Sequence, residues 1–192
     1  MPAQTTTNTL LISIGGSPEP LVESILLNNP QTIIYFASDQ SQSVIHEAIL
    51  PQLAKRGACI PPATTIITPD PQDLGTSVAA LLDAVPKAMK TLTGTNQWPD
   101  KLDYTGGTKT MSAALVWVCS HHKCQYAYVG AATPEGRNKN GLGLVINGHE
   151  RILLQENPWD KLPIHAINQA LANFNIARYD LAHQKLRHLQ NQ

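Results

Sequence analysis

The sequence has few cysteines, no net charge and no long apolar run, and each shortage excludes a class of protein. Three cysteines among 192 residues are too few and too odd in number for a disulfide framework, which favours a reducing cytoplasm. Lysine plus arginine equals aspartate plus glutamate at 14 each, so we expect no general basic face that coats duplex nucleic acid. A local site for a small anion is still compatible with this balance, because backbone amides and one or two cations suffice for it.

Secretion and membrane contact are not expected either. The N-terminal stretch MPAQTTTNTLLISIGG has no basic segment before its short apolar run, so we do not expect a signal peptide. The longest apolar run, MSAALVWVC, is far shorter than a membrane span. With 42% hydrophobic residues, the chain can bury a proper core as one domain with an appendage. We therefore expect a cytoplasmic protein without a membrane partner.

Short apolar runs alternate with patterns typical of helices, and this alternation predicts the fold class. The predicted strands are residues 9–14, 32–37, 64–69, 101–105 and 125–130. Buried strands separated by helices predict an α/β fold built of βαβ units, with a mostly parallel sheet covered on both faces. In such sheets ligands bind beyond the carboxyl ends of the strands, where the polar motifs of this sequence lie.

The last third of the chain departs from the alternation. Asn147-Gly148 stands between two apolar runs and predicts a β-hairpin. After Pro158, apolar residues at near-helical spacing predict one or two helices. We therefore expect a domain at residues 1–157 and a C-terminal helical tail or linker at residues 158–192.

The stretch DYTGGTKTMSAALVWV predicts a glycine turn between a strand and a helix. Apolar residues recur at i, i+3, i+4 and i+7 from Met111, so a helix begins just before it. Free amides and the positive end of the helix dipole then face outward at the glycines, and this arrangement favours a phosphate or another anion. The expected contributors are Gly106, Gly107, the charge of Lys109 and the hydroxyls of Thr105, Thr108 and Thr110. The alternative is a threonine-capped turn with a solvated lysine; the P-loop pattern is absent.

The stretch IGGSPEPLVESI predicts a second glycine turn of this kind, after the first predicted strand. Gly15 and Gly16 make the turn, Ser17 is a helix cap or a free hydroxyl, and Pro18 suits the first helical position. The dinucleotide fingerprint is absent. An ordinary helix cap is the alternative interpretation.

Two weaker signals complete the predicted site. Asp39 follows the second predicted strand and is either a ligand contact or a helix cap. Arg137 lies in the loop of residues 130–143, which either covers a bound anion or is simply solvated. The cluster at His121 lacks the spacing of a structural zinc site, so neither a metal nor a cofactor is expected. No histidine stands at a predicted strand end, so the sequence does not point to acid–base catalysis by histidine.

The two glycine motifs together resemble the ligand loops of a known family. LLISIGGSPEPLVESI and LDYTGGTKTMSAAL are similar to the corresponding loops of CARF domains, in particular those of type III CRISPR antiviral systems. The resemblance covers roughly residues 9–155. It implies a Rossmann-like CARF fold, a homodimer and a cyclic oligoadenylate bound across the dimer axis. The loop positions of the family fall here on Gly16 and Ser17 and on the four residues from Gly106 to Lys109.

Some CARF proteins are ring nucleases, so the resemblance also implies an activity. We expect metal-independent cleavage of cyclic tetra-adenylate by the ribose 2′-hydroxyl, with Lys109, Ser17 and Thr108 as catalytic residues. One alternative is a sensory domain of a larger effector that binds the ring without cutting it; another is an unrelated Rossmann-like nucleotide-binding protein. The ring size and the adenine contacts stay open, although loops such as residues 38–41 and 68–73 are placed to supply those contacts.

Overall fold

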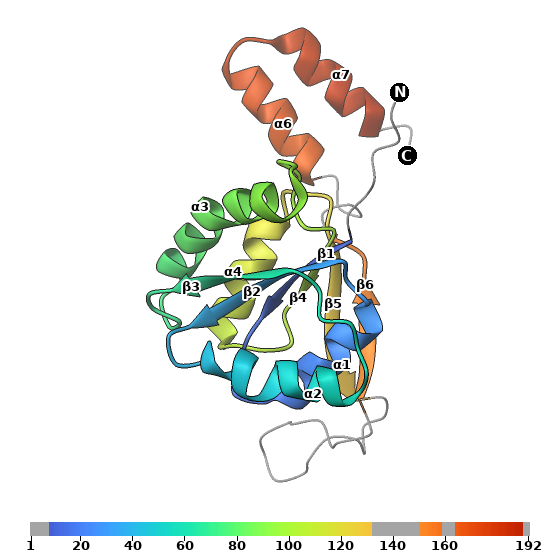
Figure 1. The fold of residues 1–192 in the computed structure, drawn as a ribbon. Helices are drawn as coiled ribbons and strands as arrows, with labels where there is room; N and C mark the ends of the chain where they lie inside the picture. The colour runs from blue at the N-terminus through green and yellow to red at the C-terminus, as the bar shows by residue number, and fades with distance from the viewer. Residues whose placement is uncertain (1–7, 132–149, 159–163, 190–192) are drawn as a thin grey trace. The chain divides into compact units, whose positions relative to one another are not determined.

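The structure, a computed structural model, describes residues 8–131, 150–158 and 164–189 (Figure 1). The chain divides into two compact units, Met1–Gln155 and Glu156–Gln192. Arg137 and the turn at Asn147-Gly148 lie outside the described residues. No helix in the described ranges is both long enough and apolar enough to cross a membrane.

The first unit is built on a six-stranded sheet in the order β3-β2-β1-β4-β5-β6. The strands are β1 (Thr9–Ser13), β2 (Thr32–Ser38), β3 (Ala63–Thr68), β4 (Lys101–Asp103), β5 (Gln125–Ala131) and β6 (Glu150–Gln155). All neighbouring strands are parallel except β5 and β6, which are antiparallel. The α/β class and the mostly parallel sheet are therefore confirmed, and the second apolar run of the predicted hairpin is strand β6.

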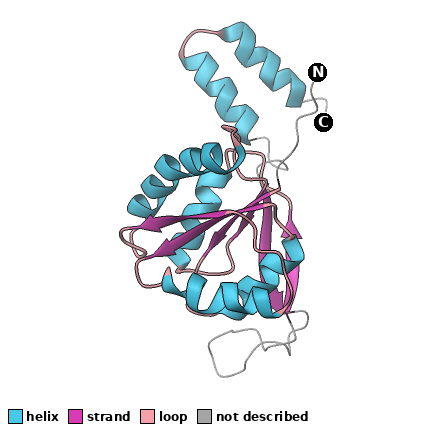
Figure 2. Ribbon diagram, in the orientation of Figure 1, coloured by secondary structure: helices cyan, strands magenta, loops and turns pink. Residues whose placement is uncertain are grey.

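Helices cover the two faces of this sheet (Figure 2). One face carries α1 (Pro18–Asn28), the π-helix η1 (Ile45–Ile49) and α2 (Leu50–Lys55); the other carries α3 (Leu74–Thr93) and α4 (Lys109–Cys119). Alternate residues of a strand enter different cores: Leu11 packs with α3 and α4, whereas Leu10 packs with α1 and α2. Both faces of β1 are buried, which explains its continuous apolar run.

The order of the strands creates a topological switch point at β1. Leu11 pairs with Ile34 of β2 on one side and with Leu102 of β4 on the other. The chain leaves β1 toward β2 and β3, and α3 then carries it back to β4 on the opposite side of β1. The turns that follow β1 and β4 therefore lie side by side at the carboxyl edge, the place where open α/β sheets bind ligands.

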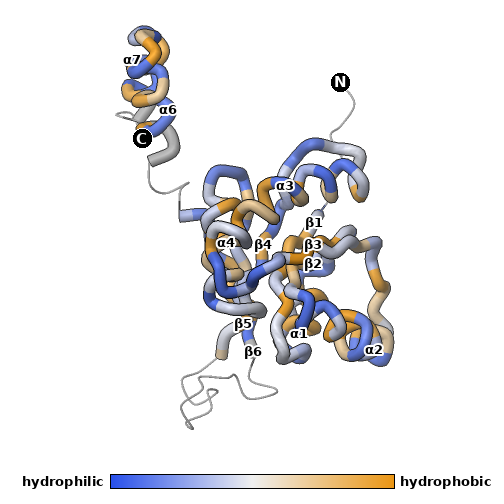
Figure 3. The backbone as a smooth tube through the Cα atoms, turned by 90° about the vertical axis from the view of Figure 1, so that its left-hand side faces the viewer, coloured by the Kyte–Doolittle hydropathy of each residue, from blue (hydrophilic) through white to orange (hydrophobic). Residues whose placement is uncertain are grey.

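The second unit is a pair of helices, α6 (Ile164–Asn175) and α7 (Tyr179–Leu189). Ala170 and Ala182 are buried between them, and the rings of Phe174 and Tyr179 meet edge to face at 5.1 Å. Hydrophobic and hydrophilic residues alternate along both helices in Figure 3. The predicted C-terminal helical segment is confirmed.

Candidate functional site

The turn after β4 has the conformation that its glycines predict. Gly107 has φ of +77°, in the left-handed region that favours glycine. Thr108 is the N-cap of α4: its Oγ1 accepts a hydrogen bond of 3.1 Å from the amide of Met111. Helix α4 then begins at Lys109, directly after the turn.

The two glycine turns pack against each other so closely that no side chain fits between them. A Cβ on Gly15 would lie 2.7 Å from the nitrogen of Gly107. A Cβ on Gly106 would collide with the carbonyl oxygen of Ser13 and lie 2.8 Å from Cδ2 of Leu21. The hydroxyl of Ser13 donates a hydrogen bond of 2.7 Å to the carbonyl oxygen of Gly106 and joins β1 to the second turn. Backbone rather than side chains therefore forms the contact between the two turns.

The start of α4 offers backbone donors to an anion. In the described part of the chain, the amides of Gly107, Thr108, Lys109 and Thr110 donate no hydrogen bond. Such amides carry the positive end of the helix dipole, and glycine lets an anion approach them closely. The exposed side chain of Lys109 adds a full positive charge at the first residue of the same helix.

The hydroxyl of Ser17, at the start of α1, does not cap the helix. Ser17 is exposed and occupies the N-cap position, but its side chain makes no capping hydrogen bond. An N-cap oxygen normally accepts from the second or third helical amide, and the third residue here is Pro20, which has no N–H. The hydroxyl of Ser17 is therefore available to a ligand, as the sequence suggested.

Two cavities open on either side of the glycine turns, and they share Gly15, Gly16 and Gly107. The first cavity measures about 220 Å³ and is lined by Gly15, Gly16, Ser17, Pro20, Leu21, Thr105, Gly106, Gly107, Tyr128 and Val129. The second measures about 300 Å³ and is lined by Ile14, Gly15, Gly16, Ser38, Gln40, Ser41, Val44, Pro71, Gln72, Gly107, Thr108 and Met111. The glycine turns thus form a ridge between two hollows.

Most of the predicted ligand residues lie on this ridge. Pro18, Asp39, Lys109 and Thr110 line neither cavity, although each of the four adjoins a residue that does. Asp39 is exposed, and its carbonyl oxygen accepts a hydrogen bond from Gln42. Among the described residues, no group of three or more histidine, cysteine, aspartate or glutamate side chains is placed to hold a metal ion.

The hydroxyls of Thr108 and Thr110 face the protein more than a ligand. Besides its capping role, Thr108 Oγ1 donates a hydrogen bond of 2.5 Å to the carbonyl oxygen of Pro71, and Thr110 Oγ1 donates one of 3.4 Å to that of Gln72. Both bonds fasten the loop after β3 to the glycine turn. The sequence analysis assigned the threonine hydroxyls to the anion, whereas in the structure the group of Thr108 that remains available to a ligand is its amide.

Replacing Thr108 with valine is expected to lower the free energy of unfolding by about 1–2 kcal/mol, because the helix loses its cap and the β3–α3 loop loses its anchor. Urea unfolding measures the loss. Serine at this position keeps the hydroxyl and should stay within about 0.5 kcal/mol of the wild type. Equal losses for the two variants would contradict the assigned hydrogen bonds.

Asp103 is a buried carboxyl group beneath the second turn, and sequence reasoning missed it. Its Oδ2 accepts a hydrogen bond of 2.5 Å from the hydroxyl of Ser24 on α1, and its Oδ1 accepts one of 2.7 Å from the amide of Thr105. The hydroxyl oxygen of Thr105 in turn accepts a hydrogen bond of 2.8 Å from the amide of Val129. One carboxyl group thus joins α1, β4 and the turn. The available signal was a charged residue at the end of an apolar strand.

Burial raises the pKa of Asp103 above its ordinary value of 3.8, against the hydrogen bonds from Ser24 and Thr105, which lower it. Between about pH 4 and the raised pKa, the folded protein holds a proton that the unfolded chain has released, so the free energy of unfolding falls as pH rises through this window. We expect Asp103→Asn to remove this pH dependence of the free energy of unfolding. Urea unfolding between about pH 4 and about pH 8 measures it, and parallel profiles for wild type and variant would contradict the expectation.

An aromatic pair borders the same turn and was also missed. The rings of Tyr104 and Tyr128 stack at 5.5 Å with 14° between their planes, and the hydroxyl of Tyr104 donates a hydrogen bond of 3.0 Å to Gln155 Oε1. Tyr128 lines the first cavity. The sequence places these tyrosines 24 residues apart, and only the parallel pairing of β4 with β5 brings them together.

Neither a family model nor a curated protein matches the sequence, but solved structures match the fold. Can2 from Sulfobacillus thermosulfidooxidans, in complex with cyclic tetra-adenylate, matches 79% of this chain with a TM-score of 0.50 at 13% identity. Csm6 from Enterococcus italicus, bound to cyclic hexa-2′-fluoro-hexa-dAMP, matches 96% of this chain with a TM-score of 0.60 at 11% identity. VC1899 from Vibrio cholerae matches 68% of this chain with a TM-score of 0.50 at 18% identity, and the match covers 34% of the VC1899 chain.

The fold is thereby identified as the Rossmann-like CARF fold that the glycine motifs suggested. This chain spans 37% of the length of the Can2 chain and 50% of that of the Csm6 chain. At identities this low the likeness concerns the fold, and the chemistry of the site has to be argued from its own residues.

Proposed function

We propose that the protein binds a cyclic oligoadenylate, in particular cyclic tetra-adenylate, across a homodimer and cleaves it without a metal. The observation that carries the proposal is the ridge at the switch point, where two glycine turns expose unpaired amides at the start of α4. Such a ridge suits a phosphodiester, because its recognition comes from backbone donors and glycine permits close approach. Can2 and Csm6, which share the fold, are both bound to cyclic oligonucleotides in their structures.

The symmetry of such a ligand and the exposed side of α4 support the homodimer. Lys109, Ala113 and Trp117 are exposed at successive turns of that helix, and Trp117 is 53% exposed. A tryptophan on the exposed side of a helix is typical of an interface. An isologous contact along α4 brings two copies of Lys109 toward one axis, where they can face one ring of phosphates.

The two cavities support a ring of four nucleotides. Each protomer has two cavities divided by the glycine ridge, so a dimer has twice two, or four. If each cavity receives one nucleoside, the dimer accommodates four nucleosides, and its two ridges hold two of the four phosphates. This division favours the tetra-adenylate ring over the hexa-adenylate ring.

Cleavage requires only that one ribose and its neighbouring phosphate be held in line. The 2′-oxygen attacks phosphorus, the bond from phosphorus to the 5′-oxygen breaks, the proton of the 2′-hydroxyl is released, and the 5′-oxygen takes up a proton. Two symmetry-related cuts yield two linear di-adenylates, each with a 2′,3′-cyclic phosphate and a 5′-hydroxyl. The amides at the start of α4 and the charge of Lys109 would stabilise the negative oxygens of the phosphorane. Ser17 would orient the ribose, and positioning would supply the rest of the rate.

Incubation of the purified protein with labelled cyclic tetra-adenylate in EDTA, followed by chromatography, tests the activity. We expect conversion to linear di-adenylate, and Ser17→Ala should slow it by about 10-fold to 100-fold while leaving the free energy of unfolding unchanged, because Ser17 caps nothing. A ring left intact over hours by excess wild-type protein would overturn the enzymatic part. A ring cleaved equally fast by the variant would remove Ser17 from the mechanism.

A sensor that binds the ring without cutting it is the second candidate. Two observations favour it: among the described residues no histidine lines either cavity, and this chain spans half or less of the length of the Can2 and Csm6 chains. Tight binding with one ring per two chains and no product would identify the sensor. Binding of a mononucleotide by a monomer would instead indicate an unrelated Rossmann-like nucleotide-binding protein.

A further inference from the structure

The second cavity has a lining and a volume that a phosphate site alone does not explain. Its wall next to the ridge consists of Gly15, Gly16 and Gly107, so a phosphate held on the ridge directs its attached nucleoside into one of the two cavities. The loops after β1, β2, β3 and β4 contribute to its lining. Its volume of about 300 Å³ is at the lower end of the range for small-molecule sites and matches one nucleoside better than a larger ligand.

The lining combines apolar surface with a few polar groups, as sites for planar heterocycles do. Ile14, Val44, Pro71 and Met111 supply the apolar part. A purine ring is flat and largely apolar on its faces, so it is stabilised between such side chains, while its edge requires hydrogen-bond partners.

Two glutamines stand at this cavity with their side-chain amides uncommitted. Gln40 and Gln72 both line it, both are exposed, and neither side-chain amide makes a hydrogen bond within the described residues. A carboxamide presents a donor and an acceptor side by side. This pair complements the 6-amino group and the adjacent ring nitrogen of adenine.

The loop that carries Gln72 is held in place before any ligand arrives. The buried hydroxyls of Thr68 and Ser77 lie 3.1 Å apart, and each lies within hydrogen-bond distance of the carbonyl oxygen of Asp70, at 3.1 Å and 3.3 Å respectively. The amide of Gln72 donates a hydrogen bond of 2.8 Å to Asp70 Oδ1, and Thr108 fastens the neighbouring Pro71 to the glycine turn. A fixed backbone with a free side chain lowers the entropic cost of binding.

We infer that the second cavity is an adenine-recognition subsite and that Gln40 and Gln72 determine its preference for adenine. The inference rests on the proposed binding of cyclic oligoadenylate and adds where and how the base is read. Thr108 acts in it as a positioning residue, because its hydroxyl holds the wall that presents Gln72.

The test compares two rings that differ only at the base edge. One is cyclic tetra-adenylate; in the other, each adenine is replaced by purine, which lacks the 6-amino group; both carry 2′-fluoro riboses so that neither can be cut. We expect wild-type protein to bind the adenine ring about 10-fold or more tightly than the purine ring. The double variant Gln40→Leu/Gln72→Leu should lose this preference through weaker binding of the adenine ring, with little change for the purine ring.

Gln97→Leu is the matched control, because Gln97 is exposed, precedes β4 at the opposite edge of the sheet and lines neither cavity. It should bind both rings as the wild type does. A double variant that retains the full preference for adenine, with normal binding by the wild type, would overturn this inference and leave the proposed function in place. Wild-type protein that binds neither ring would overturn both.

Discussion

Replacing Gly106 with alanine is expected to cost about 2–3 kcal/mol of the free energy of unfolding and to abolish binding of cyclic oligoadenylate. The added methyl group would collide with the carbonyl oxygen of Ser13 and lie 2.8 Å from Leu21 Cδ2 and 3.0 Å from the amide nitrogen of Gly15. Two of these neighbours are backbone atoms of the adjacent turn and strand, so the collision cannot be relieved by a change of rotamer. The turns must separate, and the ridge between the cavities is then lost.

Two other glycines separate the effect on the fold from the effect on the site. Gly75 is a matched control in α3, away from both cavities, where a Cβ makes only an ordinary contact of 3.5 Å with Asp73 Oδ1. Gly75→Ala should leave binding unchanged and the stability equal or slightly higher, since alanine favours helices. A Cβ on Gly16 meets no atom within 4 Å, so Gly16→Ala should fold normally but weaken binding, because the methyl group occupies ligand space. Normal binding by Gly106→Ala would contradict the role of the turns.

Replacing Lys109 with methionine is expected to weaken binding of cyclic tetra-adenylate by at least about 100-fold and to flatten the dependence of affinity on salt. Methionine keeps most of the length of the side chain and removes its charge. A charge-assisted hydrogen bond to a phosphate contributes about 1.5–3 kcal/mol, and a two-fold dimer loses two of them at once. Isothermal titration at two salt concentrations measures both effects, and turnover should fall in parallel if the same charge stabilises the phosphorane.

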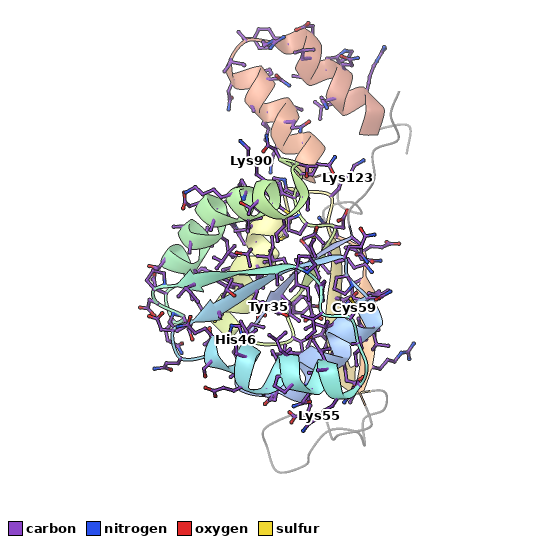
Figure 4. The ribbon with its side chains drawn as sticks, viewed as in Figure 1. Tyr35, His46, Lys55, Cys59, Lys90 and Lys123 are labelled. Atoms are coloured by element: carbon purple, nitrogen blue, oxygen red, sulfur yellow. The ribbon has the colours of Figure 1, made fainter. Side chains whose placement is uncertain are left out.

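Lys90→Met is the control for this experiment. Lys90 lies in the last turn of α3, at the opposite end of that helix from the loop that lines the second cavity (Figure 4). Removing its charge changes the net charge of the protein by the same amount without touching the site. Equal weakening by the two variants would mean that only the overall charge matters. A salt dependence of Lys109→Met equal to that of the wild type would remove Lys109 from the phosphate contact.

The elements that the sequence predicted well are those specified by local rules. Strands β1 and β2 are buried on both faces, so their residues form continuous apolar runs. Helix α4 buries one side only, so Met111, Ala114 and Leu115 recur at helical spacing. The glycine turns were equally visible, because few residues other than glycine suit such a turn at the start of a helix.

The polar contacts of the site depended on long-range pairing and were not readable from the chain. Thr108 and Pro71 are separated by 37 residues, and Asp103 and Ser24 by 79. Spacing along one sequence says nothing about which hydroxyl meets which carbonyl at that distance. The sequence analysis therefore assigned the threonine hydroxyls to the ligand, whereas in the structure the hydroxyls of Thr108 and Thr110 donate hydrogen bonds to backbone carbonyl oxygens.

By itself, the sequence determined the α/β class, the position of both glycine turns and the start of a helix just before Met111, since each follows from periodicity or from the conformational demands of a few adjacent residues. Only the tertiary structure decided that the two turns touch, that a buried carboxyl group supports one of them and that cavities open on both sides. These features arise because the chain returns from β3 to the far side of β1. That crossover is favoured by the packing of whole helices on a whole sheet, and no local pattern encodes it.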